Sequence, residues 1–328
     1  MTKLISINKK ISFFKKKTIS VEGDKSLSIR FILLSSLSKG KCIGKNLLKS
    51  EDVVSSINII RKLGIKIKLK NKNCEVHGKG LNGFRYRRNI ILNAGNSGTT
   101  ARLICASVID TRHHIKITGD KSLRKRDMER IIKPLSKFGA KFESNNKKLP
   151  IKIIGPKKLK PIFYNEKLGS AQCKSAVMIA ALKTEGKTKI KCKPSRNHTE
   201  LMFKKVLKIP IKVRKLKKSE FIEIDGLNEF NNFDYKIPGD ISSASFFIVL
   251  TLLSKNSFLT IKEVNINPSR TGIITILNKM GAQIKFLNKR NYKGEVIADI
   301  YVKSNNNLKS ISLNPNLNTS AIDEFLLI

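Results

Sequence analysis

The sequence predicts an α/β protein of two domains that are built from repeated units. The chain has 328 residues, of which 40% are hydrophobic, and this is more than one ordinary domain contains and enough for packed cores. Four of its segments resemble one another at nearly constant spacing. Within each segment, apolar residues recur first with the period of a helix and then with the alternation of a strand.

The four similar segments each begin with a small polar turn and continue into an apolar helix. The glycines that open them lie 72, 74 and 70 residues apart, and the segments read GDKSLSIRFILLSSL from Gly23, GNSGTTARLICASVI from Gly95, GSAQCKSAVMIAALK from Gly169 and GDISSASFFIVLTLL from Gly239. A short strand, an amphipathic helix and another strand follow, as in KLGIKIKL after the first helix pair. Each unit is therefore predicted to be strand, helix, strand, helix, strand.

The net charge of +42 indicates anionic ligands. A nucleic-acid-binding protein is one candidate, and it would bind DNA or RNA with a steep dependence on salt. However, the lysines are spread along the whole chain, aromatic residues make up only 6%, and Trp is absent, so stacking platforms for single strands are scarce. We therefore expect small anionic substrates and no nucleic acid.

The cysteines and histidines indicate a cytoplasmic protein without a metal. None of the five cysteines forms a CxxC pair, which favours reduced thiols, and the four histidines show no HExxH or Cys/His ligand spacing. No run of about 18 apolar residues is free of Lys, Asn or Ser, so no membrane span is expected. The basic start before Glu22 could be a transit peptide, but Ile5 to Phe14 is better interpreted as short strand-like pieces.

The glycine-rich turns can bind anions. Ser, Thr, Asn and Asp cap helix starts, glycine lets the backbone approach a ligand, and helix N-termini present free N–H groups and a positive dipole end. Cations accompany these turns: Lys25 lies in the first, Arg126 follows the turn at Gly119, and Arg196 follows Ser195. Several such turns that converge on one cleft would bind phosphate and carboxylate groups.

Together these motifs resemble the EPSP synthase family. The motifs are GDKSLSIR, NAGNSGTTARL, GDKSLRKRDMERIIKPLSKFGA, GSAQCKSA, PSRNHTE, PGDISSAS and a final IDE, in the order of that family, from Gly23 to the end of the chain. The resemblance implies an enzyme of aromatic amino-acid biosynthesis that joins shikimate-3-phosphate to phosphoenolpyruvate and releases phosphate. It implies no metal or organic cofactor, and we expect a monomer.

The resemblance also implies a two-lobe enolpyruvyl transferase fold of repeated βαβαββ units. We expect the chain to cross between the lobes near Ser20 and Asn228. The first lobe would be discontinuous and partial, with residues 1–20 and 228–328. The second lobe, residues 21–227, would hold three complete repeats.

Site residues follow from the matching motifs. Lys25 would touch both substrates, and Asp323 would accept the proton of the 5-hydroxyl group. The remaining contacts to shikimate-3-phosphate would come from Ser26, Arg30, Ser170, Ala171, Gln172, Ser195 and Arg196. The remaining contacts to phosphoenolpyruvate would come from Asn96, Gly98, Thr99, Arg126 and Gln172.

The chain departs from the family pattern in several places. Asp127 stands where proline usually follows the clamping arginine, and an acid there could weaken the grip of Arg126 on phosphoenolpyruvate. Asn197 replaces a common Asp, and Phe325 to Ile328 follow the IDE motif without the usual proline. The chain also ends five residues after Asp323, where the family continues for roughly a hundred residues. We therefore expect a fragment or a truncated product, and in the second case little catalysis and an under-packed first lobe.

Two further functions remain as alternatives. A truncated remnant would bind shikimate-3-phosphate without turnover. A UDP-N-acetylglucosamine enolpyruvyl transferase shares the fold, but it typically carries a reactive loop cysteine, and the comparable stretch from Gly119 to Arg130 has none.

Overall fold

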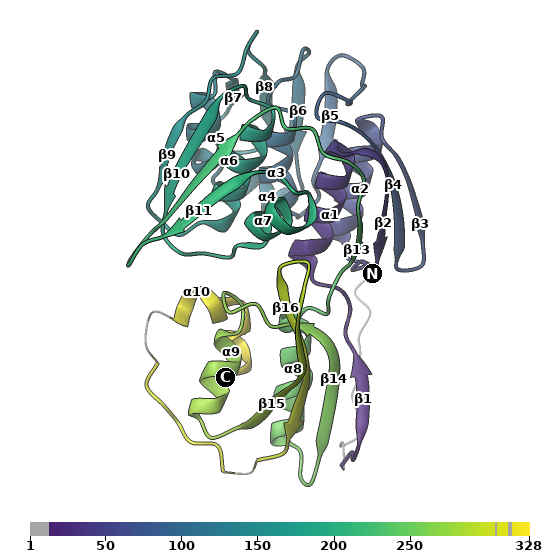
Figure 1. Ribbon diagram of the computed structural model, residues 1–328, viewed down its shortest axis with the longest axis vertical. Helices are drawn as coiled ribbons and strands as arrows, with labels where there is room; N and C mark the ends of the chain where they lie inside the picture. The colour runs from purple at the N-terminus through teal and green to yellow at the C-terminus, as the bar shows by residue number, and fades with distance from the viewer. Residues whose placement is uncertain (1–12, 306, 314–316) are drawn as a thin grey trace. The chain divides into compact units, whose positions relative to one another are not determined.

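The structure is a computed structural model that describes residues 13–305, 307–313 and 317–328 (Figure 1). Residues 1–12, which include most of the strand-like pieces expected from Ile5 onward, lie outside the described residues. The chain forms two compact units. Unit 1 comprises Met1–Val21, Gly239–Tyr292 and Val296–Ile328, and unit 2 comprises Glu22–Pro238 and Lys293–Glu295.

Each unit is built from four-stranded sheets of one topology. A first strand pairs in parallel with the second, the second pairs antiparallel with the fourth, and the third lies at the far edge beside the fourth. In unit 2 the three sheets, from first strand to far edge, are β13 (Asp234–Lys236), β2 (Lys39–Lys45), β4 (Asn73–Lys79) and β3 (Lys66–Lys70); β5 (Ile90–Asn93), β6 (Ile115–Thr118), β8 (Ile151–Ile154) and β7 (Lys141–Ser144); and β9 (Phe163–Glu166), β10 (Lys187–Cys192), β12 (Glu220–Asp225) and β11 (Ile211–Lys215). The sheet of unit 1 is β1 (Lys17–Ser20), β14 (Phe258–Asn265), β16 (Glu295–Lys303) and β15 (Gln283–Tyr292).

The helices alternate with these strands, so each repeat is a βαβαββ unit with one strand more than the sequence pattern alone predicted. The helices of unit 2 are α1 (Lys25–Leu37), α2 (Glu51–Lys62), α3 (Gly98–Ser107), α4 (Lys121–Lys125), α5 (Glu129–Lys137), α6 (Ala171–Leu182), α7 (His198–Leu201) and the π-helix η1 (Met202–Val206). Those of unit 1 are α8 (Ile241–Leu253), α9 (Gly272–Lys279), α10 (Asn318–Ala321) and the 3₁₀-helix η3 (Ile322–Leu327). The mixed α/β class predicted from the sequence is confirmed.

Two sheets take their first strand from a distant part of the chain. β13 pairs with β2, so that Asp234 lies opposite Ile43, and β1 pairs with β14, so that Lys17 lies opposite Leu259. Residues 228–238, which we expected in the first lobe, therefore belong to unit 2, because β13 completes the first sheet of that unit.

The helices that follow the glycine-rich turns form the core of unit 2. From Leu27 to Leu37, every residue of α1 is buried, and α6 is buried from Cys173 to Leu182. A helix that is apolar on all sides has to be buried, and α3 packs against both α1 and α6 (Figure 1). The core of unit 2 therefore lies along these three parallel elements.

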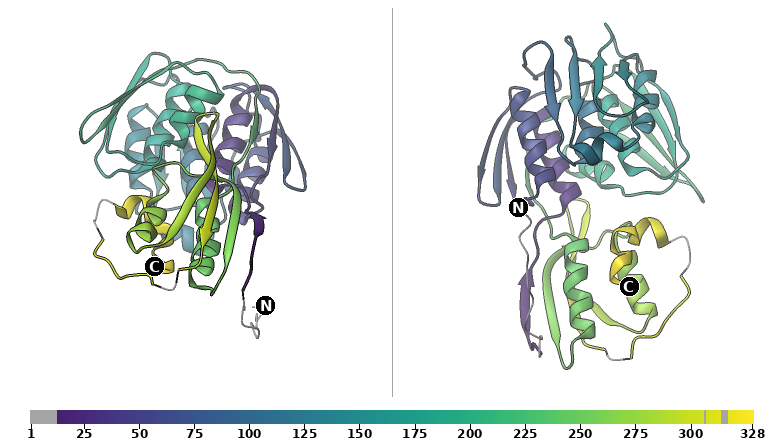
Figure 2. Two further views of the ribbon diagram at one scale, coloured as in Figure 1. Left: turned by 60° about the horizontal axis from the view of Figure 1, so that its bottom comes forward. Right: turned by 180° about the vertical axis from the view of Figure 1, so that it is seen from behind.

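In unit 1 the corresponding helix, α8, has a different environment. It lies alongside β14 (Figure 2) and buries Ile241, Ala244, Ile248 and Leu252 there. Its other face exposes a row of apolar side chains, namely Phe246, Phe247, Leu250 and Leu253. The same apolar pattern that is buried all round in α1 and α6 is thus buried on one side only in α8.

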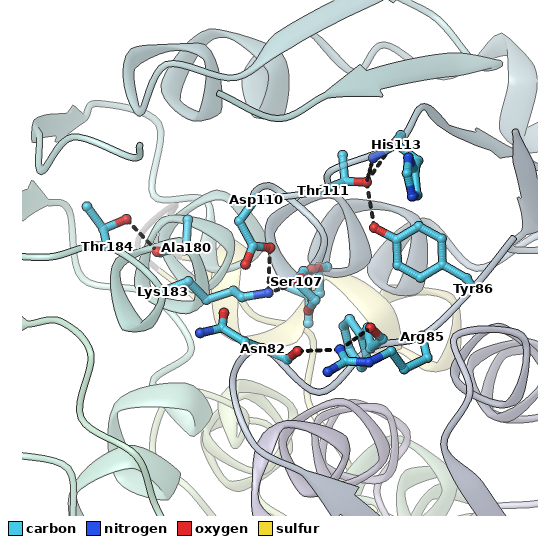
Figure 3. Close-up of polar contacts among 12 residues, drawn as sticks. Asn82, Arg85, Tyr86, Ser107, Asp110, Thr111, His113, Ala180, Lys183 and Thr184 are labelled. Atoms are coloured by element: carbon cyan, nitrogen blue, oxygen red, sulfur yellow. Dashed lines mark hydrogen bonds and ion pairs between the residues drawn. The ribbon is translucent and has the colours of Figure 1, made fainter. Parts of the chain in front are cut away.

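A buried lysine joins the C-terminal ends of α3 and α6 (Figure 3). Lys183 Nζ donates to the Ser107 carbonyl at 3.0 Å and to Asp110 Oδ1 at 2.5 Å. Burial lowers the pKa of Lys183, and Asp110 opposes this effect. A cation at this place satisfies a helix-end carbonyl and interacts favourably with the helix dipole.

The cysteines provide a test of the core. All five are unpaired and buried, and burial raises the pKa of each thiol, to about 12 for Cys74 and Cys105 and to about 11 for Cys192. Because the thiolate is the nucleophile, we expect negligible reaction with a disulfide reagent at pH 8 in the folded protein and full reaction of all five in denaturant. A cysteine that titrates rapidly without denaturant would contradict this packing.

Candidate active site

Three helix starts meet at one end of the core of unit 2. Each has the expected cap: Asp24 Oδ1 accepts from Leu27 N at 2.8 Å, Ser97 Oγ accepts from Thr100 N at 3.2 Å, and Ser170 Oγ accepts from Cys173 N at 3.3 Å. The first turns of α3 and α6 contact each other directly through their side chains. The positive dipole ends of these helices therefore point to a common region.

Gln172 links the first turns of α3 and α6. Its Oε1 accepts from Arg102 Nη1 at 2.6 Å, and its Nε2 donates to Thr99 Oγ1 at 3.0 Å. Arg126 Nη2 donates to Asn96 Oδ1 at 3.0 Å in the turn before α3. The structure thus brings together the residues that the motifs assign to phosphoenolpyruvate.

Gly98 lies between two guanidinium groups. A Cβ atom at this position would lie 2.9 Å from Arg102 Nη1 and 3.2 Å from Arg126 Nη1. Only glycine therefore leaves both cations in their present places. Burial, together with repulsion from Arg126 and Arg130, lowers the pKa of Arg102. A bound anion would relieve that repulsion, which makes this cluster a suitable anion site.

Arg102 was not among the predicted site residues. Its position in the GNSGTTARL motif contained a signal, because it lies four residues after Gly98 and hence one helical turn along the same face. The sequence could not show that its guanidinium turns back over the first turn of α3.

The acid beside the clamping arginine is occupied elsewhere. Asp127 Oδ1 accepts from the backbone N–H of Glu129 at 2.8 Å, at the start of α5. The carboxylate thus supports the start of a helix, where a negative charge is favourable. The structure records no ion pair between Asp127 and Arg126 among the residues that it describes, so the expected weakening of Arg126 has no visible basis.

Lys25 is tied to the same region. Its Nζ lies 3.3 Å from Asp52 Oδ2, and its side chain is half exposed. The carbonyl of Asp52 accepts from Ser56 Oγ at 3.0 Å, and Ser56 Oγ lies 2.6 Å from Thr100 Oγ1. This network connects the start of α1, through α2, to the start of α3.

Arg30 lies deeper in the core. Its side chain is bonded to α6 and α7 by donation from Nη2 to Ser175 Oγ at 3.1 Å and from Nε to Thr199 Oγ1 at 2.8 Å. With 3% of its surface exposed, it is a buried cation, and burial lowers its pKa to about 10. It remains protonated at neutral pH.

The other predicted residues fall at three places. Ser170 and Ala171 form the start of α6, next to Gln172. Ser195 and Arg196 lie in the loop between β10 and α7, and Arg196 is close enough to Arg30 to lower its pKa. Asp323 belongs to unit 1, where it is an exposed residue of η3.

A separate basic groove lies beside α4. It encloses about 540 Å³ and is lined by Gly119, Asp120, Lys121, Arg124, Lys125 and Lys148, none of which is a predicted substrate contact. Within the described residues, no group of His, Cys, Asp and Glu has the arrangement of a metal site. No described helix is both long and apolar enough to cross a bilayer.

This fold and this cluster define a class of protein: a βαβαββ-repeat α/β protein whose helix starts and guanidinium groups bind small anions. A family model for EPSP synthase (3-phosphoshikimate 1-carboxyvinyltransferase) matches residues 14–323. The chain belongs to the EPSP synthase family, whose enzymes catalyse enolpyruvyl transfer in the shikimate pathway.

Individual relatives agree with this assignment. The 3-phosphoshikimate 1-carboxyvinyltransferase of Thermoanaerobacter sp. (strain X514) is 41% identical over 318 residues, which cover 96% of this chain and 73% of that protein. The enzyme of the same name from Petrotoga mobilis is 41% identical over 315 residues, or 94% of this chain and 71% of that protein. The structure of EPSP synthase from Acinetobacter baumannii superposes with a TM-score of 0.85 at 35% identity, covering 95% of this chain and 70% of that one.

Proposed function

We propose that this chain binds shikimate-3-phosphate and phosphoenolpyruvate at the helix starts of unit 2 and transfers the enolpyruvyl group to the 5-hydroxyl of the first. The observation that supports this most is the arrangement around Gly98, where two guanidinium groups and Gln172 surround a helix N-terminus. Phosphoenolpyruvate carries a phosphate and a carboxylate, and arginine binds both groups with two parallel hydrogen bonds.

The proposed reaction has two stages. The 5-hydroxyl oxygen bonds to the enol carbon, its proton passes to Asp323, and the methylene carbon gains a proton to become a methyl group. A methyl proton and the phosphate then leave, which restores the double bond. Lys25 would contact both substrates, and Arg126, Asn96, Gly98, Thr99 and Gln172 would hold phosphoenolpyruvate. Ser26, Arg30, Ser170, Ala171, Ser195 and Arg196 would hold shikimate-3-phosphate.

Binding of shikimate-3-phosphate without turnover is a second candidate. It is favoured by the distribution of the predicted contacts, because Asp323 is the one member of the predicted set that belongs to unit 1. The other contacts lie on unit 2 and could bind the ligand by themselves.

Calorimetry and phosphate release distinguish the two candidates. Titration with shikimate-3-phosphate is expected to give a dissociation constant between about 1 μM and 1 mM, as is usual for enzyme substrates, and UDP-N-acetylglucosamine should give no heat. Release of phosphate at about 1 per second or faster with both substrates would establish the transferase. Binding without release would support the second candidate, and absence of binding would contradict both.

We also infer a cytoplasmic monomer that does not bind nucleic acid. The five unpaired, buried thiols suit a reducing compartment. Light scattering after size exclusion would test the mass of 36.9 kDa, and an oligonucleotide titration at low salt would test the charge.

A further inference from the structure

Two hydroxyl groups hold the buried guanidinium of Arg30. Nε donates to Thr199 Oγ1 at 2.8 Å, Nη2 donates to Ser175 Oγ at 3.1 Å, and the two hydroxyl oxygens lie 2.7 Å apart in a bond of their own. On the other side, Nη1 donates to the Ser26 carbonyl at 3.1 Å. The plane of the guanidinium is therefore fixed by α1, α6 and α7 together.

The surroundings of Arg30 are also electrostatically balanced. Burial lowers its pKa, while Asp24, Glu200 and Glu295 act in the opposite direction. Three of the five N–H donors of the guanidinium are used in the bonds described above, which leaves one on Nη1 and one on Nη2. A charge that is held in this way has little freedom to lose when a ligand binds.

We propose that Ser175 and Thr199 are positioning residues for shikimate-3-phosphate, because they orient Arg30 so that its remaining donors are directed at that ligand. The inference depends on the proposed function, in which Arg30 contacts shikimate-3-phosphate. Neither hydroxyl needs to touch the ligand itself. Their contribution is the orientation of one charged group, which a hydrogen bond to a charged partner can fix strongly.

Thr199 in turn depends on a second buried contact. It lies in α7, a single turn that continues into the π-helix η1, and a helix this short is not stable alone. His198 Nδ1 lies 2.7 Å from Glu295 Oε1, and both side chains are fully buried. Beside this pair, Gly294 packs against Leu201 and Lys205. The hairpin tip Lys293–Glu295, which belongs to unit 2, thus fixes the segment that presents Thr199.

Thr199→Val tests the proposal, since it removes the hydroxyl but keeps the shape. We expect the dissociation constant for shikimate-3-phosphate, measured by calorimetry, to rise about 10-fold or more. Thr199→Ser keeps the acceptor and should stay within about 3-fold of the unchanged protein. The matched control is Thr188→Val, because Thr188 is equally buried and its hydroxyl has no partner among the described residues. This control should change affinity less than 2-fold, roughly the scatter of a neutral site.

A spectroscopic measurement separates positioning from simple loss of stability. In the unchanged protein the Nε–H proton of Arg30 should exchange slowly with solvent, and Thr199→Val should accelerate this exchange while the thermal midpoint stays close to that of Thr188→Val. If Thr199→Val does not fold, Ser175→Ala carries the same test. Absence of shikimate-3-phosphate binding in the unchanged protein would overturn the proposed function. Binding that is equally tight in Thr199→Val would overturn only the positioning role.

Discussion

Replacing Lys174 with methionine is expected to destabilise the protein by about 3–5 kcal/mol, because it leaves buried carboxylates without their cation. Lys174 Nζ lies 2.6 Å from Glu200 Oε1 and 3.6 Å from Glu220 Oε2, and the lysine side chain is completely buried. Burial by itself lowers the pKa of Lys174, but the attraction of the two carboxylates outweighs it and raises that pKa. The stabilisation is therefore complete below the ordinary value of 10.5 and is lost only at higher pH.

Urea denaturation of three variants checks this prediction. Lys174→Met should lower the midpoint strongly, whereas Lys189→Met, on the exposed side of β10, should change stability by less than about 0.5 kcal/mol. Adding Glu200→Gln to Lys174→Met should recover part of the loss, because it neutralises one of the stranded charges. Equal midpoints for the two single variants would show that the buried cluster contributes nothing.

Replacing Gly98 with alanine should have a large effect on binding and a small effect on stability. The added Cβ would displace the ends of Arg102 and Arg126, which are flexible and move at little energetic cost. The displaced guanidinium groups would no longer meet an anion at the start of α3. We expect the affinity for phosphoenolpyruvate, in the presence of shikimate-3-phosphate, to fall about 10-fold or more.

Two measurements on this variant provide its control. The thermal midpoint should stay within about 2 °C of the unchanged protein, since alanine is well tolerated in helices. Binding of shikimate-3-phosphate alone should change little, because its predicted contacts lie at the other helix starts. Unchanged affinity for phosphoenolpyruvate in a folded variant would show that the guanidinium pair does not hold this ligand.

The glycine-rich helix starts could be predicted because their signals are local. A cap such as Ser97 or Ser170 and the apolar helix behind it lie within a few residues of each other. For the same reason, the repeat spacing correctly predicted the mixed α/β class. The additional strand of each repeat was missed because the last two strands form a hairpin whose alternation reads as one extended stretch.

The contacts that fix the side chains could not be predicted. Nothing local distinguishes Lys174 or Arg102 from the other members of a set of 66 basic residues, most of which a solvated surface would accommodate. The pair formed by His198 and Glu295 joins residues 97 positions apart. Such contacts depend on how repeats pack, and packing has no signature within a single segment.

The two borrowed strands set an order of events on the ribosome. Phe258, where β14 begins, follows Ser20, where β1 ends, by 238 positions. At about 5–20 residues per second, β1 waits on the order of 10–50 s before its partner has been synthesised. The first sheet of unit 2 similarly waits for β13. During this interval the nascent chain presents unpaired backbone edges, so a chaperone that covers them should raise the yield of folded protein during synthesis.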